Sequence, residues 1–274
     1  MTGQLRAGSL APPIPSAVAP TGRLQLVGDG SMLARTTGVE LGPTLLAHAA
    51  QTGCGPFLRL YLPAPTMAFT GRDRVTPGYA AAVETARLHG FAPVLRAPGG
   101  RAAAFHEDTL CIEITAHDEN PRRAVTARFA ELGRAVAAAL RTLGVPAQVG
   151  AVPGEHCPGE HSVNVAGRYK LVGTAQRLTR HGWLLGASIL IRRVEPVRAV
   201  TVSVYDALGL PFVADSMAGV VRWIPGIGVD DVASAVLAEL GRRASLMPID
   251  LSGGRSLTAD SRETGGATCA MSLG

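Results

Sequence analysis

Residues 157–191 read CPGEHSVNVAGRYKLVGTAQRLTRHGWLLGASILI, and the architecture expected of the chain follows from this segment. Its alternating and apolar runs, separated by Gly-containing links, predict three strands, over 162–165, 170–178 and 183–192. Short links join antiparallel strands, whereas parallel strands need long crossovers. The segment therefore predicts an antiparallel sheet near the middle of the fold.

Further elements are expected on both sides of this segment. Strands are predicted over 23–29, 57–63, 66–70, 93–96 and 110–115, and helices over 42–51, 77–89, 121–143, 197–208 and 230–242. The helix over 121–143 is expected to begin after Asn120 as its cap and to end at Gly144. Strands and helices mix without a regular βαβ rhythm, which favours an α+β fold: a mixed, mostly antiparallel sheet with helices packed on it.

The chain of 274 residues is long enough to bury a substantial core. Residues 1–22 are rich in proline and alanine, and residues 251–274 are rich in glycine, serine and threonine. We expect both ends to be disordered tails and residues 23–250 to form one domain.

Composition excludes several classes of protein. Charged residues make up 17% and hydrophobic residues 47%, a balance typical of a soluble globular protein. No apolar run approaches the roughly 20 residues of a membrane span, and the proline-broken start does not resemble a signal peptide. We therefore expect a cytoplasmic protein without a membrane partner.

The net charge of +5 would tolerate nucleic acid, but the arginines are dispersed and aromatic residues are only 4%. Neither a basic stripe nor a stacking platform results, so no nucleic acid is expected as a partner. The positive charge is better suited to steering an acidic protein partner.

The cysteines are Cys54, Cys111, Cys157 and Cys269, and they form no CxxC pair. This spacing predicts neither a metal site nor a disulfide framework, so we expect reduced thiols. Cys111 falls in the strand over 110–115, on the same face as Glu113, where a packing role is expected.

Two sequence motifs contain candidate functional residues. In one, Lys170 is followed directly by an apolar Leu-Val, although lysine is usually kept out of such runs. A strand-edge lysine that blocks pairing with another chain is the alternative interpretation. The other motif, RAPGGR over 96–101, has paired glycines that can bring bare backbone close to a ligand, or can form an ordinary turn.

These motifs resemble those of a known family. RAPGGRAAAFHEDTL, over 96–110, resembles the Arg-Arg-x-x-Gly-Gly-Gly-Ala-x-x-His signature of lipoate–protein ligases and octanoyltransferases. GRYKLVGTAQR, over 167–177, resembles their Gly-Arg-Lys-(Ile/Val)-x-Gly-(Ser/Thr)-Ala-Gln element. The similarity covers about residues 23–245 and implies the class II fold shared by biotin and lipoate ligases. The Gly-Arg-Gly-Arg pattern of biotin ligases is not seen, so biotin is not expected.

The resemblance also implies roles for particular residues. It places Lys170 at the reacting carbonyl, where a fixed ammonium stabilises the negative charge that acyl transfer builds on oxygen. The acyl and carrier pocket would be lined by Arg96, Gly99, Gly100 and His106. The wall behind the carbonyl would be shaped by Gly173, Thr174 and Gln176.

The chain departs from the family pattern at three positions. Arg101 stands where the family has its third glycine, and Ala97 where it has its second arginine. Gly186 replaces the histidine of the family's Leu-Gln-His-Gly-Ser-Ile-Leu strand, and His181 does not substitute for it. We expect these changes to alter the acyl pocket.

The choice of activity depends on two observations. Only about thirty residues follow Arg243, whereas ligases that make their own acyl-adenylate usually have an extra C-terminal domain. Cys157 precedes Lys170 in a loop, near where one octanoyltransferase subgroup keeps its acyl-accepting cysteine, and a thiol near a fixed cation can act as a nucleophile. We therefore expect an acyltransferase that moves an octanoyl or lipoyl group through a Cys157 thioester, with assistance from His156 or His161 as a further option.

The acceptor implied by the resemblance is the lysine of a lipoyl domain, in a 2-oxoacid dehydrogenase E2 subunit or the glycine cleavage H protein, and acyl carrier protein is a candidate donor. No permanently bound cofactor is expected. One alternative is an ATP-dependent lipoate ligase, which would need ATP and magnesium, use Lys170 on the adenylate and not need Cys157. Another is a non-catalytic protein that binds lipoate or a lipoyl domain, in which Cys157 is an exposed loop residue.

Overall fold

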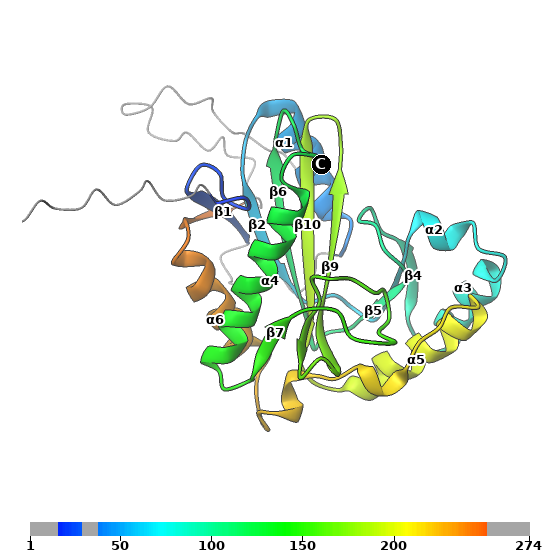
Figure 1. Cartoon of the computed structure of the whole chain (residues 1–274). Helices are drawn as coiled ribbons and strands as arrows, with labels where there is room; N and C mark the ends of the chain where they lie inside the picture. The colour runs from blue at the N-terminus through cyan, green and yellow to red at the C-terminus, as the bar shows by residue number, and fades with distance from the viewer. Residues whose placement is uncertain (1–15, 29–37, 251–274) are drawn as a thin grey trace, which may run out of the picture.

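The computed structural model describes residues 16–28 and 38–250. An eight-stranded sheet runs through the molecule in the order β11-β1-β2-β6-β10-β9-β8-β7 (Figure 1). Its strands are β1 (Arg23–Gly28), β2 (Phe57–Tyr61), β6 (Thr109–His117), β7 (Ala147–Val149), β8 (Val163–Val165), β9 (Tyr169–Leu178), β10 (Gly182–Leu190) and β11 (Ser245–Asp250). Strand β1 pairs in parallel with β2 and β11, and the other neighbours are antiparallel. The predicted α+β class and the antiparallel β8-β9-β10 arrangement are confirmed.

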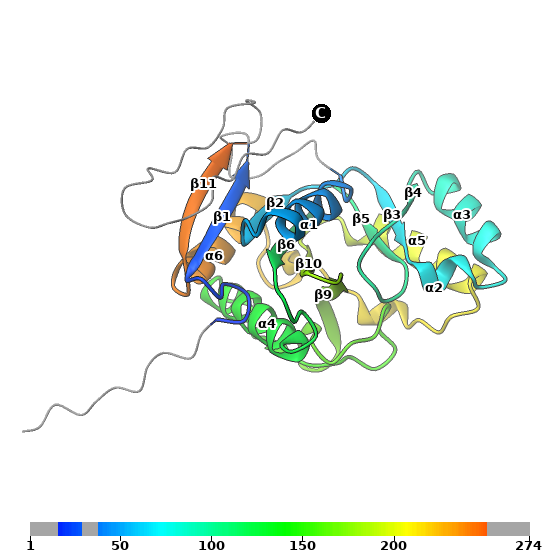
Figure 2. The same cartoon turned by 90° about the horizontal axis from the view of Figure 1, so that it is seen from above.

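Helices α4 (Val125–Thr142) and α6 (Val229–Gly241) cover one face of this sheet (Figure 2). Side chains alternate between the two faces along β6. Ile112 and Ile114 are buried against these helices, while Cys111 and Glu113 point to the opposite face. Helix α4 starts later than expected. Its N-cap position is Ala124 and not Asn120, because residues 121–124 form a turn first, in which the Arg123 N–H donates to the Asn120 carbonyl over 3.0 Å.

On the opposite face α1 (Leu41–Thr52) packs on β6 and β10, and residues of a second, smaller sheet pack against Tyr61 and Cys111. The smaller sheet has the order β4-β3-β5. Its strands are β3 (Thr66–Phe69), β4 (Ala92–Leu95) and β5 (Ala103–Phe105), flanked by helices α2 (Gly71–Arg74), α3 (Tyr79–Leu88) and α5 (Val194–Ala207). Short 3-10 turns at 214–216 and 220–222 follow α5. These elements form a lobe beside the large sheet, on the right in Figure 1.

Part of the expected N-terminal tail belongs to the core. Val18 and Ala19 are buried, and the Ser16 hydroxyl donates to Glu131 of α4 over 2.5 Å. The expectation of a disordered tail is therefore wrong for residues 16–22, and the segments 1–15 and 251–274 lie outside the described residues. None of the described helices combines the length and the apolar character that a membrane crossing requires.

Candidate active site

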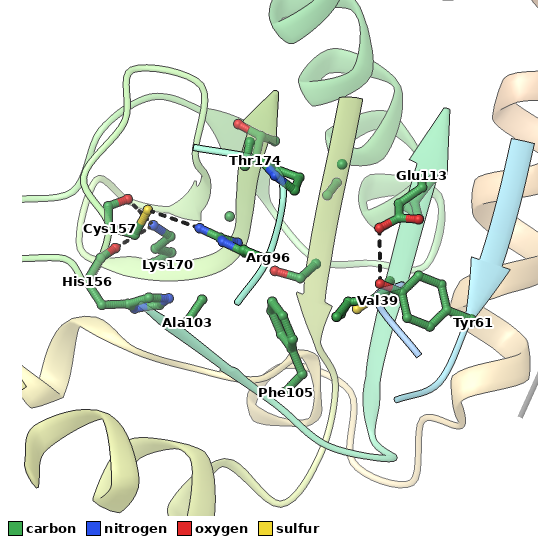
Figure 3. Close-up of a pocket in the computed structure, with 18 residues that line it drawn as sticks. Val39, Tyr61, Arg96, Ala103, Phe105, Glu113, His156, Cys157, Lys170 and Thr174 are labelled. Carbon is green, nitrogen blue, oxygen red and sulfur yellow. Dashed lines mark hydrogen bonds between the residues drawn. The ribbon is translucent and has the colours of Figure 1, made fainter. Parts of the chain in front are cut away.

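A pocket lies between the large sheet and the segment that leads from β4 into β5 (Figure 3). Its floor is built from small residues on neighbouring strands, since Gly173 pairs with Ser188 and Ala175 with Gly186. Small side chains there leave room above the sheet for a ligand. The facing wall consists of Arg96, Pro98, Ala103 and Phe105.

Cys157 lies at one side of this pocket, in the loop between β7 and β8. Its backbone is left-handed, with φ of 44°, and its N–H donates to the Tyr205 hydroxyl over 2.7 Å. The Tyr205 hydroxyl in turn donates to the Ala102 carbonyl over 3.0 Å. The loop is thus fixed to the segment that forms the other wall.

The Cys157 sulfur receives hydrogen bonds from the predicted glycine motif. The Arg101 backbone N–H donates to Sγ over 3.2 Å, and the Arg96 guanidinium lies 3.8 Å from Sγ. Arg96 also donates to the Gly99 and Arg101 carbonyls, so its position is set by the motif itself. A backbone N–H and a guanidinium are donors that stabilise a negatively charged sulfur.

Gly100 shows why the motif needs glycine. Its φ is +101°, and a Cβ at this position would lie 2.6 Å from the Cys157 sulfur and 3.2 Å from the Arg96 guanidinium. The expected close approach of bare backbone is therefore an approach to Cys157. Gly99 plays a different part, since its N–H donates to the Gln176 carbonyl over 3.2 Å and joins the motif to β9.

Replacing Gly100 by alanine should lower the rate of the acyl transfer that the motifs lead us to expect by about a hundredfold, because the new methyl group displaces the sulfur from its donors. Gly144→Ala is a matched control, since Gly144 has φ of +98° and nothing within 4 Å of the added Cβ. Backbone strain should cost both variants a similar free energy of unfolding, about 1–2 kcal/mol. Initial rates and thermal melts measure both effects, and equal activity in the two variants would contradict the contact with Cys157.

Lys170 is buried, with 3% exposure, and its ammonium is committed to the Cys157 loop. Its Nζ lies 2.8 Å from a carboxylate oxygen of Glu155, and it donates to the carbonyls of His156 and Cys157 over 2.8 and 3.1 Å. These contacts account for the three donors of an ammonium. Lys170 lines the pocket, as expected, and its ammonium holds the Cys157 loop; a role at a reacting carbonyl stays a prediction. The strand-edge alternative is wrong, because β9 is paired on both sides.

Not every residue implied by the resemblance lies in the pocket. Gly173 and Thr174 line it, as expected. His106 does not, because its ring lies in a buried turn where Nε2 contacts the Arg193 carbonyl at 2.9 Å. The side chain of Gln176 is also outside the lining, and accepts a hydrogen bond from the Arg128 guanidinium of α4 over 2.8 Å.

The two candidate assisting histidines differ in position. His156 lines the pocket and packs edge-on against Phe212, whereas the His161 ring stacks on Phe129. Burial and the neighbouring cations Lys170 and Arg96 lower the pKa of His156 well below its usual range. The imidazole is therefore neutral at physiological pH.

This pKa shift predicts a dependence of stability on pH. Below about pH 6.5 the unfolded chain takes up a proton at His156 that the folded chain does not, so the free energy of unfolding should fall with decreasing pH. The slope attributable to His156 is at most about 1.4 kcal/mol per pH unit. Denaturant unfolding of the wild type and of His156→Phe, from pH 7.5 to 5.5, measures it. An unchanged slope in the variant would rule out a neutral His156.

The other cysteines in the described residues have different environments. Cys111 is buried, and burial together with the charge of Glu113 raises its pKa to about 12, so it stays a thiol. Cys54 is disulfide-bonded, which corrects the expectation of reduced thiols for this residue. Cysteine spacing along the sequence does not show whether a cysteine is paired in the fold. Cys269 lies outside the described residues.

Two residues that hold Lys170 and Cys157 in position, Glu155 and Tyr205, were not predicted from the sequence. Glu155 is fully buried, pairs with Lys170, and accepts from Ser162 and from the N–H of Val152. Tyr205 comes from α5, about fifty residues away along the chain. Glu155 stands only two positions before Cys157, so its proximity was visible in the sequence; nothing in the sequence points to Tyr205.

Comparison with solved structures defines the class of fold. A bipartite lipoate protein ligase from Thermoplasma acidophilum matches with a TM-score of 0.61 and 19% identity, covering 84% of this chain and 88% of that chain. The T. acidophilum protein Ta0514 with bound lipoic acid matches with a TM-score of 0.64 and 16% identity, covering 84% and 89%. These similarities show that the chain has the fold of lipoate ligase catalytic domains.

The family follows from the sequence. The model of the lipoyl protein ligase A/B catalytic domain matches residues 38–241, so the chain belongs to this family. The octanoyl-[GcvH]:protein N-octanoyltransferase of Geobacillus kaustophilus is 23% identical over 152 residues, which are 56% of this chain and 53% of that enzyme. The chain thus aligns with about half the length of this curated relative.

Proposed function

We propose that this protein is an acyltransferase of protein lipoylation, which moves an octanoyl or lipoyl group onto the lysine of a lipoyl domain through a thioester on Cys157. The observation that carries the proposal is the position of the Cys157 sulfur, at the side of a pocket and between the Arg101 N–H and the Arg96 guanidinium. Family membership and the octanoyltransferase relative support the acyl group and the kind of acceptor.

The reaction has two steps. In the first, the Cys157 thiolate attacks the acyl carbonyl carbon of the donor, which is a thioester in acyl carrier protein and a lysine amide in a modified lipoyl domain. The new S–C bond forms, the C–S or C–N bond of the donor breaks, and the donor thiolate or lysine amine leaves and takes a proton. In the second, the deprotonated lysine amine of the lipoyl domain attacks the Cys157 thioester, and an amide forms. The Cys157 sulfur leaves as the thiolate, and the proton lost by the amine passes to solvent.

The surrounding residues have supporting roles in this scheme. Arg96 and the Arg101 N–H stabilise the sulfur when it is negatively charged. Arg96 also lines the pocket, so its guanidinium lies beside the space proposed for the acyl group. Lys170 and Tyr205 keep the Cys157 backbone in place. Burial and the cations Lys170 and Arg96 disfavour protonation of His156, so this scheme assigns it no proton-transfer role.

The alternative function, an ATP-dependent ligase, is supported by a similar solved structure, a lipoate–protein ligase A bound with ATP. This structure matches with a TM-score of 0.61 and 16% identity, covering 83% of this chain and 88% of that chain. The ligase alternative requires a lysine free to meet an adenylate. Lys170 is instead occupied by Glu155 and two loop carbonyls, which favours the thioester scheme.

The proposed donor is acyl carrier protein or an already modified lipoyl domain. The proposed acceptor is the H protein or an E2 lipoyl domain, and ATP and magnesium belong to the ligase alternative alone.

Transfer without ATP tests the proposal. Octanoyl-acyl carrier protein and octanoyl-H protein are each incubated with an unmodified E2 lipoyl domain and the enzyme, and intact-mass measurement follows the acceptor. We expect an octanoyl-modified acceptor from at least one donor without ATP or magnesium. Modification only from free octanoate with ATP would favour the ligase, and binding of the lipoyl domain without any transfer would favour a non-catalytic protein.

A further inference from the structure

The far side of the pocket contains polar groups that the proposed function does not use. Figure 3 shows Cys157 and Lys170 at one side, and Glu113 and Tyr61 at the other, with Arg96 and Phe105 between them. Apart from Glu113, Tyr61 and the Cys111 thiol, the lining at that side is mainly apolar. An acyl chain attached at Cys157 would extend towards these polar groups.

Glu113 is held in a defined orientation. The Arg59 guanidinium donates to its Oε2 over 2.6 Å, and the Tyr61 hydroxyl donates to its Oε1 over 3.2 Å. A Cβ added at Gly42 would lie 2.4 Å from Oε2, so helix α1 packs closely against that oxygen. The other oxygen, Oε1, faces Tyr61.

This carboxylate can accept a further hydrogen bond. Within residues 16–28 and 38–250 each oxygen of Glu113 has one hydrogen bond, whereas a carboxylate offers about four acceptor sites. Gly186 lies directly across from Glu113 on β10, and the absence of a side chain there leaves the cavity open beside the carboxylate. Burial raises the pKa of Tyr61 well above its usual range, so its hydroxyl remains a donor.

We propose that Glu113, with Tyr61, forms a specificity site for acyl groups that have a hydrogen-bond donor, a hydroxyl or a thiol, at the distal end of a medium-length chain. An unsubstituted chain places a methyl group against a carboxylate and leaves the acceptor without a partner, which is unfavourable. A distal hydroxyl or thiol supplies the missing hydrogen. A site built to bond a substrate hydroxyl discriminates strongly against the analogue that lacks it. This inference rests on the proposed function only in assigning the pocket to an acyl chain.

Equilibrium binding tests the inference without requiring catalysis. Isothermal calorimetry compares octanoate, 8-hydroxyoctanoate and dihydrolipoate with the full-length wild type. We expect both substituted acids to bind at least about tenfold more tightly than octanoate. Preference for only one of them would identify hydroxyl or thiol as the donor. Equal or weaker binding of both would overturn the site.

Variants separate specificity from folding. Glu113→Gln should remove the preference, because a neutral amide is a weaker acceptor than a carboxylate. Glu239→Gln is the matched control: Glu239 is also buried and paired with arginines, but it lies on α6, outside the pocket lining. The control should keep the wild-type ratio of affinities. Should Glu113→Gln fail to fold, Arg59→Met combined with Glu113→Leu removes both charges, and it should bind octanoate more tightly than 8-hydroxyoctanoate.

Comparing the relative rates of octanoyl and 8-hydroxyoctanoyl transfer then distinguishes the two proposals. Transfer of both groups at equal rates, with equal affinities for the acids, would refute the specificity site and leave the acyltransferase proposal standing. A binding preference without any transfer would support the site and refute the proposed activity.

Discussion

Cys157→Ser should lose at least about a thousandfold in the rate of acyl transfer, because a serine hydroxyl without an activating base is a poor nucleophile. The sulfur receives a hydrogen bond from a backbone N–H, and a guanidinium lies 3.8 Å away; these are suited to a thiolate, and the hydroxyl remains protonated. The free energy of unfolding should change little, since the substitution is nearly isosteric. Initial rates with an acyl thioester donor, and denaturant melts, measure the two effects.

Cys111→Ser is the matched control for this variant. Cys111 also lines the pocket, but the pKa of its thiol is about 12, so it is not a nucleophile at neutral pH. We expect the control to retain transfer within about tenfold of the wild type. If Cys157→Ser keeps full activity without ATP, direct attack of the target lysine on the donor would have to replace the thioester scheme.

Lys170→Ala should abolish transfer and also destabilise the fold, by roughly 3–5 kcal/mol, because it leaves the buried carboxylate of Glu155 without its cation. If Lys170 only supplied a charge at the reacting carbonyl, as the family resemblance implies, the variant would lose activity but keep its stability. A denaturant melt of Lys170→Ala therefore distinguishes this role from that of holding the Cys157 loop. Lys170→Arg should fail as well, since the longer planar guanidinium does not fit the three contacts of the ammonium.

A double variant tests whether Lys170 acts through position. Lys170→Met with Glu155→Gln removes both charges and should recover much of the lost stability. Activity should stay low, because methionine cannot donate to the carbonyls of His156 and Cys157 that the ammonium now holds. Full activity in the double variant would show that neither the charge nor the hydrogen bonds of Lys170 are needed.

The sequence predicted the fold well where a local pattern carries the information. Alternation along β6 predicted correctly that Cys111 and Glu113 share a face, and short links predicted the antiparallel β8-β9-β10 group. Strand β5 and β11 were not predicted, because neither has a strong alternation of its own and each is formed by pairing with a strand distant in sequence. Burial of Val18 and Ala19 likewise depends on α4 being nearby.

The sequence predicted most of the residues that form the candidate site, but only some of the contacts that their side chains make. The paired glycines and the cysteine were found from motifs, and the structure brings Gly100 against Cys157. The contacts of Lys170 were not predicted, because they depend on how the loop before Cys157 folds and buries Glu155 against the ammonium. His106 illustrates the opposite error, since a residue within the motif turns away into a local hydrogen-bonded turn.

Denaturing mass spectrometry of the wild-type protein, after brief incubation with octanoyl-acyl carrier protein and no ATP, tests the central claim most directly. We expect a mass increase of one octanoyl group, located on the peptide that contains Cys157, removed by hydroxylamine and absent in Cys157→Ser. Addition of an unmodified lipoyl domain should discharge the adduct and produce an octanoylated acceptor. An unmodified Cys157 under conditions in which the acceptor does become octanoylated would contradict the thioester mechanism.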